Sequence, residues 1–139
     1  MTKLLLSLHV LAAIIAIGPV TVAASMFPAA ARRGQRDALP LLHRICRVYA
    51  LFGVAVPVFG LATASSLGVL GDTWLITSIV LTGLAAALLG LAVLPGQQRV
   101  IAGEDVPPGR LGMLTGVFNL LWAVVVVLMI IRPGSTTGA

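Results

Sequence analysis

The sequence has little charge, and almost none of it lies within its long apolar stretches. Only 9% of the 139 residues are charged, whereas an ordinary soluble domain has about 25%. Hydrophobic residues make up 59% of the chain, and the mean hydropathy is +1.10. This balance is typical of a chain that lies mostly in a membrane. The length predicts a single domain over residues 1–139.

Acidic residues are absent from the apolar runs. All four lie between them, at Asp37, Asp72, Glu104 and Asp105. A proton relay or cation site built on carboxylates within the membrane is therefore not expected. The phosphate-binding loop, the G-x-S-x-G elbow and the H-E-x-x-H zinc motif are also missing. We predict no catalytic residue, and the sequence favours a protein without enzymatic activity.

Cysteine and histidine are scarce as well. Cys46 is the single cysteine, so it can form no internal disulfide, and one thiol makes no zinc site. It lies in a basic cluster with His43, Arg44 and Arg47. A reactive thiol beside arginines is one interpretation. We favour the other, in which the cluster anchors the chain to lipid headgroups and Cys46 is a small buried apolar residue.

Long charge-free runs occupy most of the chain. They cover residues 4–31, 48–71, 73–98 and 111–131, and each exceeds the roughly 18 residues that mark a transmembrane candidate. We predict helices over about 4–27, 42–68, 74–94 and 111–131, forming an all-α, antiparallel four-helix bundle in a membrane. The first run could also be a signal peptide, but its length and the basic residues that follow it favour an uncleaved helix.

Basic residues gather in two of the three connections. The first connection and the start of the second helix carry five, at Arg32, Arg33, Arg36, Arg44 and Arg47, and the third connection carries Arg99 and Arg110. The second has Asp72 and no base. The positive-inside rule then places the first and third connections in the cytoplasm and both termini outside, in a bacterial plasma membrane. We expect the five arginines to contact anionic lipid headgroups, and we expect no nucleic-acid partner.

Small and polar residues recur at helical spacing in the predicted spans. Gly112-x-x-x-Gly116 is a pair that lets helices approach closely, and we favour packing inside the bundle over dimerisation. We assign Gly60 to helix packing and Asn119 to a hydrogen bond between helices. Pro57 predicts a kink in its helix, because proline removes one backbone hydrogen bond. The third connection, which begins with Pro95, is too rich in proline and glycine for a long helix.

His9 is the ionisable side chain of the first span. It could be an axial ligand of haem b, or a proton or quinone contact. It could also be a neutral ring bonded to a backbone carbonyl or to Asn119. We favour the structural interpretation, because a bis-histidine haem needs a second histidine at similar depth in the membrane. By the predicted topology His43 lies at the cytoplasmic side, whereas His9 lies in the outer half. The prediction is therefore no cofactor and no metal, with haem b at His9 as the alternative.

The segment around His9 carries a family resemblance. It reads L-x-x-x-L-H-V-L-x-A over residues 4–13. With the arginine-rich first connection and three further spans, it resembles the bacterial membrane proteins of domain of unknown function 2269. The resemblance covers the whole chain in length and number of spans, and implies the fold; the family has no established function.

Similar openings occur in copper-resistance and haem-associated membrane families, which keeps haem b open. Many of those relatives carry an aromatic residue and a glycine later in the first helix. This chain has Ile17-Gly18-Pro19 there, which departs from the pattern that would imply a shared cofactor role.

Together these patterns indicate a small non-enzymatic integral membrane protein, an accessory or scaffold subunit of a membrane complex. Its expected partners are the lipid bilayer and either another membrane protein or a second copy of the chain. Two alternatives stay open. One is a haem- or quinone-linked redox protein that uses His9. The other is a small oligomeric transporter whose path is lined by His9, Asn119 and the kink at Pro57.

Overall fold

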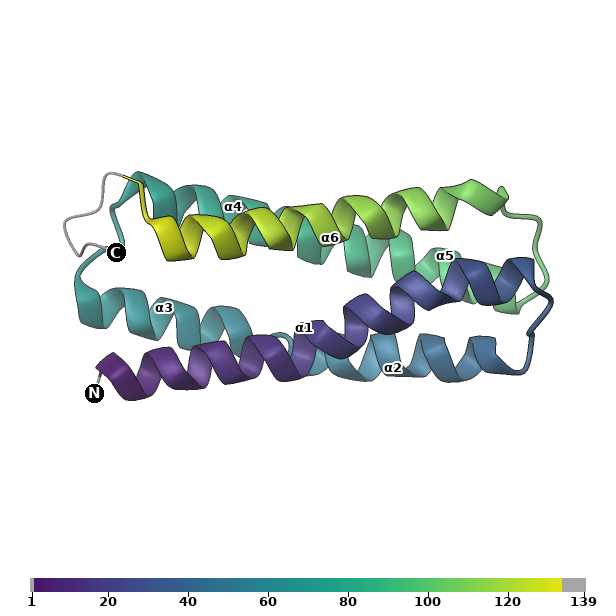
Figure 1. Ribbon diagram of the computed structural model, residues 1–139, viewed down its shortest axis with the longest axis horizontal. Coiled ribbons are helices and arrows are strands. Elements are labelled where there is room, and N and C mark those ends of the chain that lie inside the picture. Colours follow the sequence, from purple (N-terminus) through teal and green to yellow (C-terminus); the bar gives the residue numbers. More distant parts are fainter. Residues whose placement is uncertain (1, 134–139) are drawn as a thin grey trace.

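The computed structural model describes residues 2–133 and consists of four long helical segments in an antiparallel bundle (Figure 1). No strand occurs among these residues, so the predicted all-α four-helix fold is confirmed. The segments are α1 (Thr2–Arg32), α2 (Ala38–Phe52) with α3 (Ala55–Leu67), α4 (Thr73–Leu88) with the π-helical η1 (Leu89–Val93) and α5 (Leu94–Ile101), and α6 (Pro108–Ile131).

Each segment is long and apolar enough to cross a membrane. The side chains that face outward are largely aliphatic. Leu91 is 80% exposed, Leu51 71% and Leu120 68%. Such a surface suits lipid contact and would be unfavourable in water. The fold is therefore that of a multi-pass membrane protein, as the charge-free runs predict.

The first segment is longer than predicted. α1 continues to Arg32 and passes through Pro19 and Pro28 without ending. Membrane helices tolerate such prolines where neighbouring helices pack around them, and Pro28 is buried. At 1.5 Å per residue, α1 is about 46 Å long, against a hydrocarbon core of about 30 Å. One end of the helix must therefore reach into the headgroup region or beyond.

The second segment is interrupted, but a little before the predicted position. α2 ends at Phe52 and α3 begins at Ala55, whereas Pro57 lies within α3. Pro57 has no N–H for the carbonyl of Gly53, and its ring crowds that carbonyl. The backbone responds with tighter bonds, Val54 N to Leu51 O at 3.2 Å and Val56 N to Gly53 O at 3.1 Å. The interruption therefore lies at Gly53, whose carbonyl would have accepted the hydrogen bond that Pro57 cannot donate.

The third segment corrects the prediction that Pro95 starts an irregular connection. The helix continues to Ile101. In η1 the chain makes a wider turn, and the N–H of Leu94 bonds to the carbonyl of Leu89, five residues back. A π-helical turn of this kind locally resets the helical ladder, so the proline follows without breaking the segment. The connection itself covers only residues 102–107.

The first helical segment packs along the second, and the third packs along the fourth. α1 lies along α3 with its first half and along α2 with its second half, and α4 lies along α6 (Figure 1). The start of α1 and the end of α6 share one end of the bundle, called here the terminal end (Figure 1). The connections 33–37 and 102–107 share the opposite end, called the loop end (Figure 1). A large apolar cluster around Phe27, Leu39 and Val93 is the main core, and a smaller one contains Trp74 and Leu75.

Candidate functional site

His9 joins the first half of α1 to α3. Its Nδ1 lies 2.8 Å from the carbonyl oxygen of Val56. The ring also lies against Gly60, where an added Cβ would be 2.9 Å from Cε1 and 3.0 Å from Nδ1 of the imidazole. A residue with a side chain would collide there, so glycine permits this contact. Of the two structural interpretations of His9, the structure shows the bond to a backbone carbonyl and not the bond to Asn119.

The bond to Val56 also determines which ring nitrogen of His9 carries the proton. A carbonyl oxygen only accepts, so Nδ1 of His9 must carry the proton. In the neutral imidazole, Nε2 is then the acceptor. The bond forms one residue before Pro57, beside the interruption between α2 and α3. His9 therefore holds α1 against the segment where the second span is least regular.

A buried polar network lies nearer the loop end, and sequence reasoning missed it. His43 Nδ1 donates to Gln97 Oε1 at 3.0 Å, and Gln97 Nε2 donates to Cys46 Sγ at 3.6 Å. Gln97 is only 1% exposed and Cys46 is fully buried. The Cys46 thiol is directed at the carbonyl of Val20, at a long 3.9 Å. The network thus connects α2, α5 and α1 through side chains that satisfy one another.

Gln97 was missed because it belongs to the stretch that was predicted to be irregular. One signal could have placed it. The apolar residues Ala85, Leu89 and Val93 recur every four positions, and Gln97 is the next in that series. The same spacing past Pro95 therefore indicates that the helix continues and that the amide faces inward.

The burial of Cys46 agrees with the favoured interpretation, in which the thiol is a small apolar residue and not a reactive group. The thiol is enclosed within the main core, so it behaves as a small apolar residue. Arg44 and Arg47 are exposed and point away from the core.

Asn119 bridges α6 and α1. Its Nδ2 donates to Ser25 Oγ at 3.1 Å, and its Oδ1 accepts from Trp122 Nε1 at 3.3 Å. The predicted hydrogen bond between helices is therefore present. The hydroxyls of Thr21 and Thr115 lie one turn before Ser25 and Asn119, and both are enclosed without a hydrogen-bond partner in the described part of the chain. Polar side chains thus line the contact between α1 and α6.

The interior packing role predicted for Gly112 and Gly116 is wrong. A Cβ at either glycine would meet nothing within 4 Å. The reason is the rotation of α6, which turns Leu111, Thr115 and Phe118 into the bundle and leaves Gly112 exposed and Gly116 half-buried, with open space beside both. Pro57 is also exposed, so it acts through the missing hydrogen bond and not through contact with another helix.

The arginines assigned to lipid headgroups gather toward the loop end, and all are exposed: Arg32, Arg33, Arg36, Arg44 and Arg47. Arg36 differs from the rest, because its Nη2 donates to the carbonyls of Val100 and Ile101 at 3.3 and 3.4 Å. It ties the first connection to the end of α5. The guanidinium groups of the other four have no hydrogen-bond or ion-pair partner among residues 2–133, and these side chains are exposed.

The side chains of greatest chemical interest therefore do not converge on one centre. His9, Gln97 and Asn119 each join a different pair of helices. Within residues 2–133, no three or more histidine, cysteine or acidic side chains come together as a metal site. Comparisons of the chain with protein-family models, with curated proteins and with solved structures find no match.

Proposed function

We propose that this protein is a non-enzymatic subunit that scaffolds a larger complex in the membrane. The observation that carries the proposal is the open space beside two glycines of α6. Gly112 and Gly116 lie one turn apart, and apart from the backbone of α6 itself nothing in the described chain comes within 4 Å of where their Cβ atoms would be. A helix from another protein can approach the α6 backbone closely along this line.

The physics of membrane association favours such a face. Lipid tails are as apolar as leucine, so helices associate in a bilayer through close van der Waals packing and not through a hydrophobic drive. Glycines one turn apart allow the two backbones to come near enough for that packing. The neighbouring side chains of Met113, Val117 and Leu120 are 64, 43 and 68% exposed. They lie on one side of the glycines, where they can cover a docked helix.

The polar side chains of the spans support a structural role. His9, Gln97 and Asn119 use hydrogen-bonding atoms to hold helices of the same chain together. This use accounts for their presence without a substrate. A scaffold needs rigid internal contacts and an open outer face, and the bundle has both.

The membrane and orientation belong to the same proposal. The exposed arginines of the loop end support a cytoplasmic location for that end, with both termini outside, in a bacterial plasma membrane. Their charge also favours anionic lipid headgroups as neighbours. The proposal extends to the family of domain of unknown function 2269, on the strength of the resemblance around His9.

A mild-detergent pull-down of the full tagged chain tests the function. We expect a second membrane protein to co-purify, and Gly112→Leu to reduce its yield by about tenfold, because a leucine side chain blocks close approach. Gly83→Leu is the matched control, since Gly83 lies exposed on α4 with open space around it. It should leave the yield unchanged. Recovery of the protein by itself from native membranes would refute the proposal.

A second candidate, haem-linked redox activity, is favoured by the His9 bond. Histidines that bind a metal through one nitrogen usually donate the other N–H to a carbonyl or carboxylate, and Nδ1 of His9 donates to Val56. Nε2 is then the nitrogen that could bind iron. A purified sample that shows no Soret band after haem supplementation would remove this candidate.

A further inference from the structure

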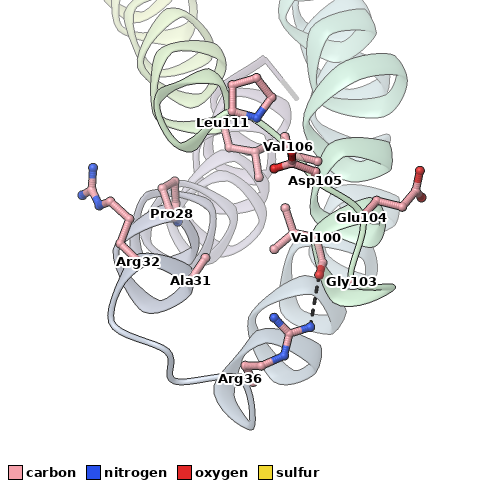
Figure 2. A pocket seen from close by; sticks show the side chains of 11 residues that line it. Pro28, Ala31, Arg32, Arg36, Val100, Gly103, Glu104, Asp105, Val106 and Leu111 are labelled. Carbon is pink, nitrogen blue, oxygen red and sulfur yellow. Dashed lines mark hydrogen bonds between the residues drawn. The ribbon is translucent and has the colours of Figure 1, made fainter.

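A cavity of about 210 Å³ lies at the loop end, between the last turns of α1, the connection 102–107 and the start of α6 (Figure 2). Its walls are mainly apolar and its margin is charged. The apolar lining comes from Pro28, Ala31, Val100, Val106 and Leu111, and the charged side chains are Arg32, Arg36, Glu104 and Asp105. Drug-sized ligands occupy pockets of about 300–1,000 Å³. This cavity therefore suits a smaller group.

One acid and one base of the margin are available to a ligand. Figure 2 shows the Asp105 side chain among the apolar lining residues and Arg36 at the margin toward α2. Asp105 has no hydrogen-bond or ion-pair partner in the described chain, whereas Glu104 pairs with Arg99 at 3.5 Å. Arg36 bonds to backbone through Nη2 only, so its other N–H groups remain available. Arg32 extends away from the cavity and is exposed (Figure 2), so it can turn toward a bound anion.

The cavity also straddles the boundary between apolar and polar regions. Pro28 and Leu111 belong to membrane-spanning helices. Arg36 and Asp105 belong to the two connections beyond those helices. At such a boundary a phospholipid would place its headgroup beside the cavity and its acyl chains beside the spans.

We propose that the cavity binds the headgroup of a zwitterionic phospholipid with a primary ammonium, phosphoethanolamine. The ammonium donates to the Asp105 carboxylate, and the phosphate accepts from Arg36 and from Arg32. Both bonds are charge-assisted and stronger than neutral ones. The pairing of one free acid with nearby guanidinium groups selects a zwitterion.

Other headgroups fit less well. A glycerol headgroup has no cation for Asp105 and would leave its carboxylate near a phosphate of like charge. A choline headgroup carries a quaternary ammonium without an N–H, so it cannot donate to the carboxylate. The proposal therefore predicts a preference between lipids that share the same phosphate.

Lipid retention by the full chain tests this inference. The protein is reconstituted in vesicles with equal parts of phosphatidylethanolamine, phosphatidylcholine and phosphatidylglycerol of matched chains. It is then extracted in mild detergent, and the bound lipids are counted by native mass spectrometry. We expect phosphatidylethanolamine to be retained about tenfold over phosphatidylcholine. Asp105→Asn should abolish that preference, and Arg32→Gln should reduce retention of both lipids.

Two variants serve as controls. Asp37→Asn and Lys3→Gln remove exposed charges that do not line the cavity, and both should leave retention unchanged. Equal retention of the ethanolamine and choline lipids by the native chain would overturn the proposal without any variant. Stronger retention of phosphatidylglycerol would also overturn it. Displacement of the lipid by free phosphoethanolamine at equal concentration would show a soluble ligand instead, and so would overturn the lipid assignment.

Discussion

At the scale of single residues, the contact between His9 and Gly60 can be tested by one methyl group. Gly60→Ala places a Cβ 2.9 Å from Cε1 of the His9 ring. The ring is held in place by its bond to Val56, so a shift that relieves the contact would strain that bond. We expect a loss of about 1–3 kcal/mol from the free energy of unfolding, measured by reversible denaturation in detergent.

Gly83→Ala is the control for that measurement, because its Cβ meets nothing within 4 Å. There the higher helix propensity of alanine should raise stability by about 1 kcal/mol or less. In a His9→Ala background, Gly60→Ala should become harmless. If the loss persists without the ring, the steric explanation is wrong.

Gln97 is the residue on which the buried network depends. Gln97→Leu leaves the Nδ1–H of His43 without its acceptor in a buried position. An unsatisfied buried donor costs about 1–3 kcal/mol, so the variant should unfold at lower denaturant concentration. The exposed neighbour variant Gln98→Leu should stay within about 0.5 kcal/mol of the native chain. A double variant that also carries His43→Leu should recover part of the loss, and failure to recover it would contradict the network.

The role of a single residue could be predicted where its polar group needed a hydrogen-bond partner within an apolar span. An imidazole in an apolar span must bond to something, and a backbone carbonyl is always near, so the role of His9 could be predicted. The outward position of Gly112 and Gly116 could not. Whether a small-residue pair faces the bundle or the lipid depends on the rotation of α6, which the inward packing of Leu111 and Phe118 sets.

At the scale of helices, proline has three different effects in this chain. α1 continues through Pro19 and Pro28, Pro57 interrupts the second span upstream of itself, and Pro95 follows a π-helical turn. Four spans follow directly from the charge-free runs. The response to each proline does not, because it depends on which neighbouring groups take over the freed backbone carbonyl.

The packing of α1 on α6 can be tested by cross-linking. Asn119 and Ser25 are hydrogen-bonded through their side chains, so a Ser25→Cys, Asn119→Cys pair should form a disulfide readily under mild oxidation. An Ile14→Cys, Asn119→Cys pair should not, because position 14 is eleven residues, or about 16 Å, further along α1. Gel mobility after proteolysis between the two helices reports the bond. Equal cross-linking of both pairs would show that α1 and α6 slide past each other.

At the scale of the whole molecule, the charge asymmetry predicts which end faces the cytoplasm. Gln35→Cys and Gly71→Cys place thiols in exposed positions at the two opposite ends. In intact cells, a membrane-impermeant maleimide should label position 71 at once and position 35 only after permeabilisation. The native chain is the blank, because Cys46 is fully buried. Labelling of position 35 from outside would reverse the proposed orientation.

The enclosure of Cys46 gives the unmodified chain an internal reporter of motion. The thiol lies among residues of the main core, directed at the Val20 carbonyl and bonded by Gln97. A small permeant alkylating reagent can reach it only when α2 separates from α1 and α5. The rate of alkylation under native conditions therefore measures the free energy of that local opening. A change in the alkylation rate of Cys46 can thus show whether bound lipids or partner proteins hold α2 more firmly against α1 and α5.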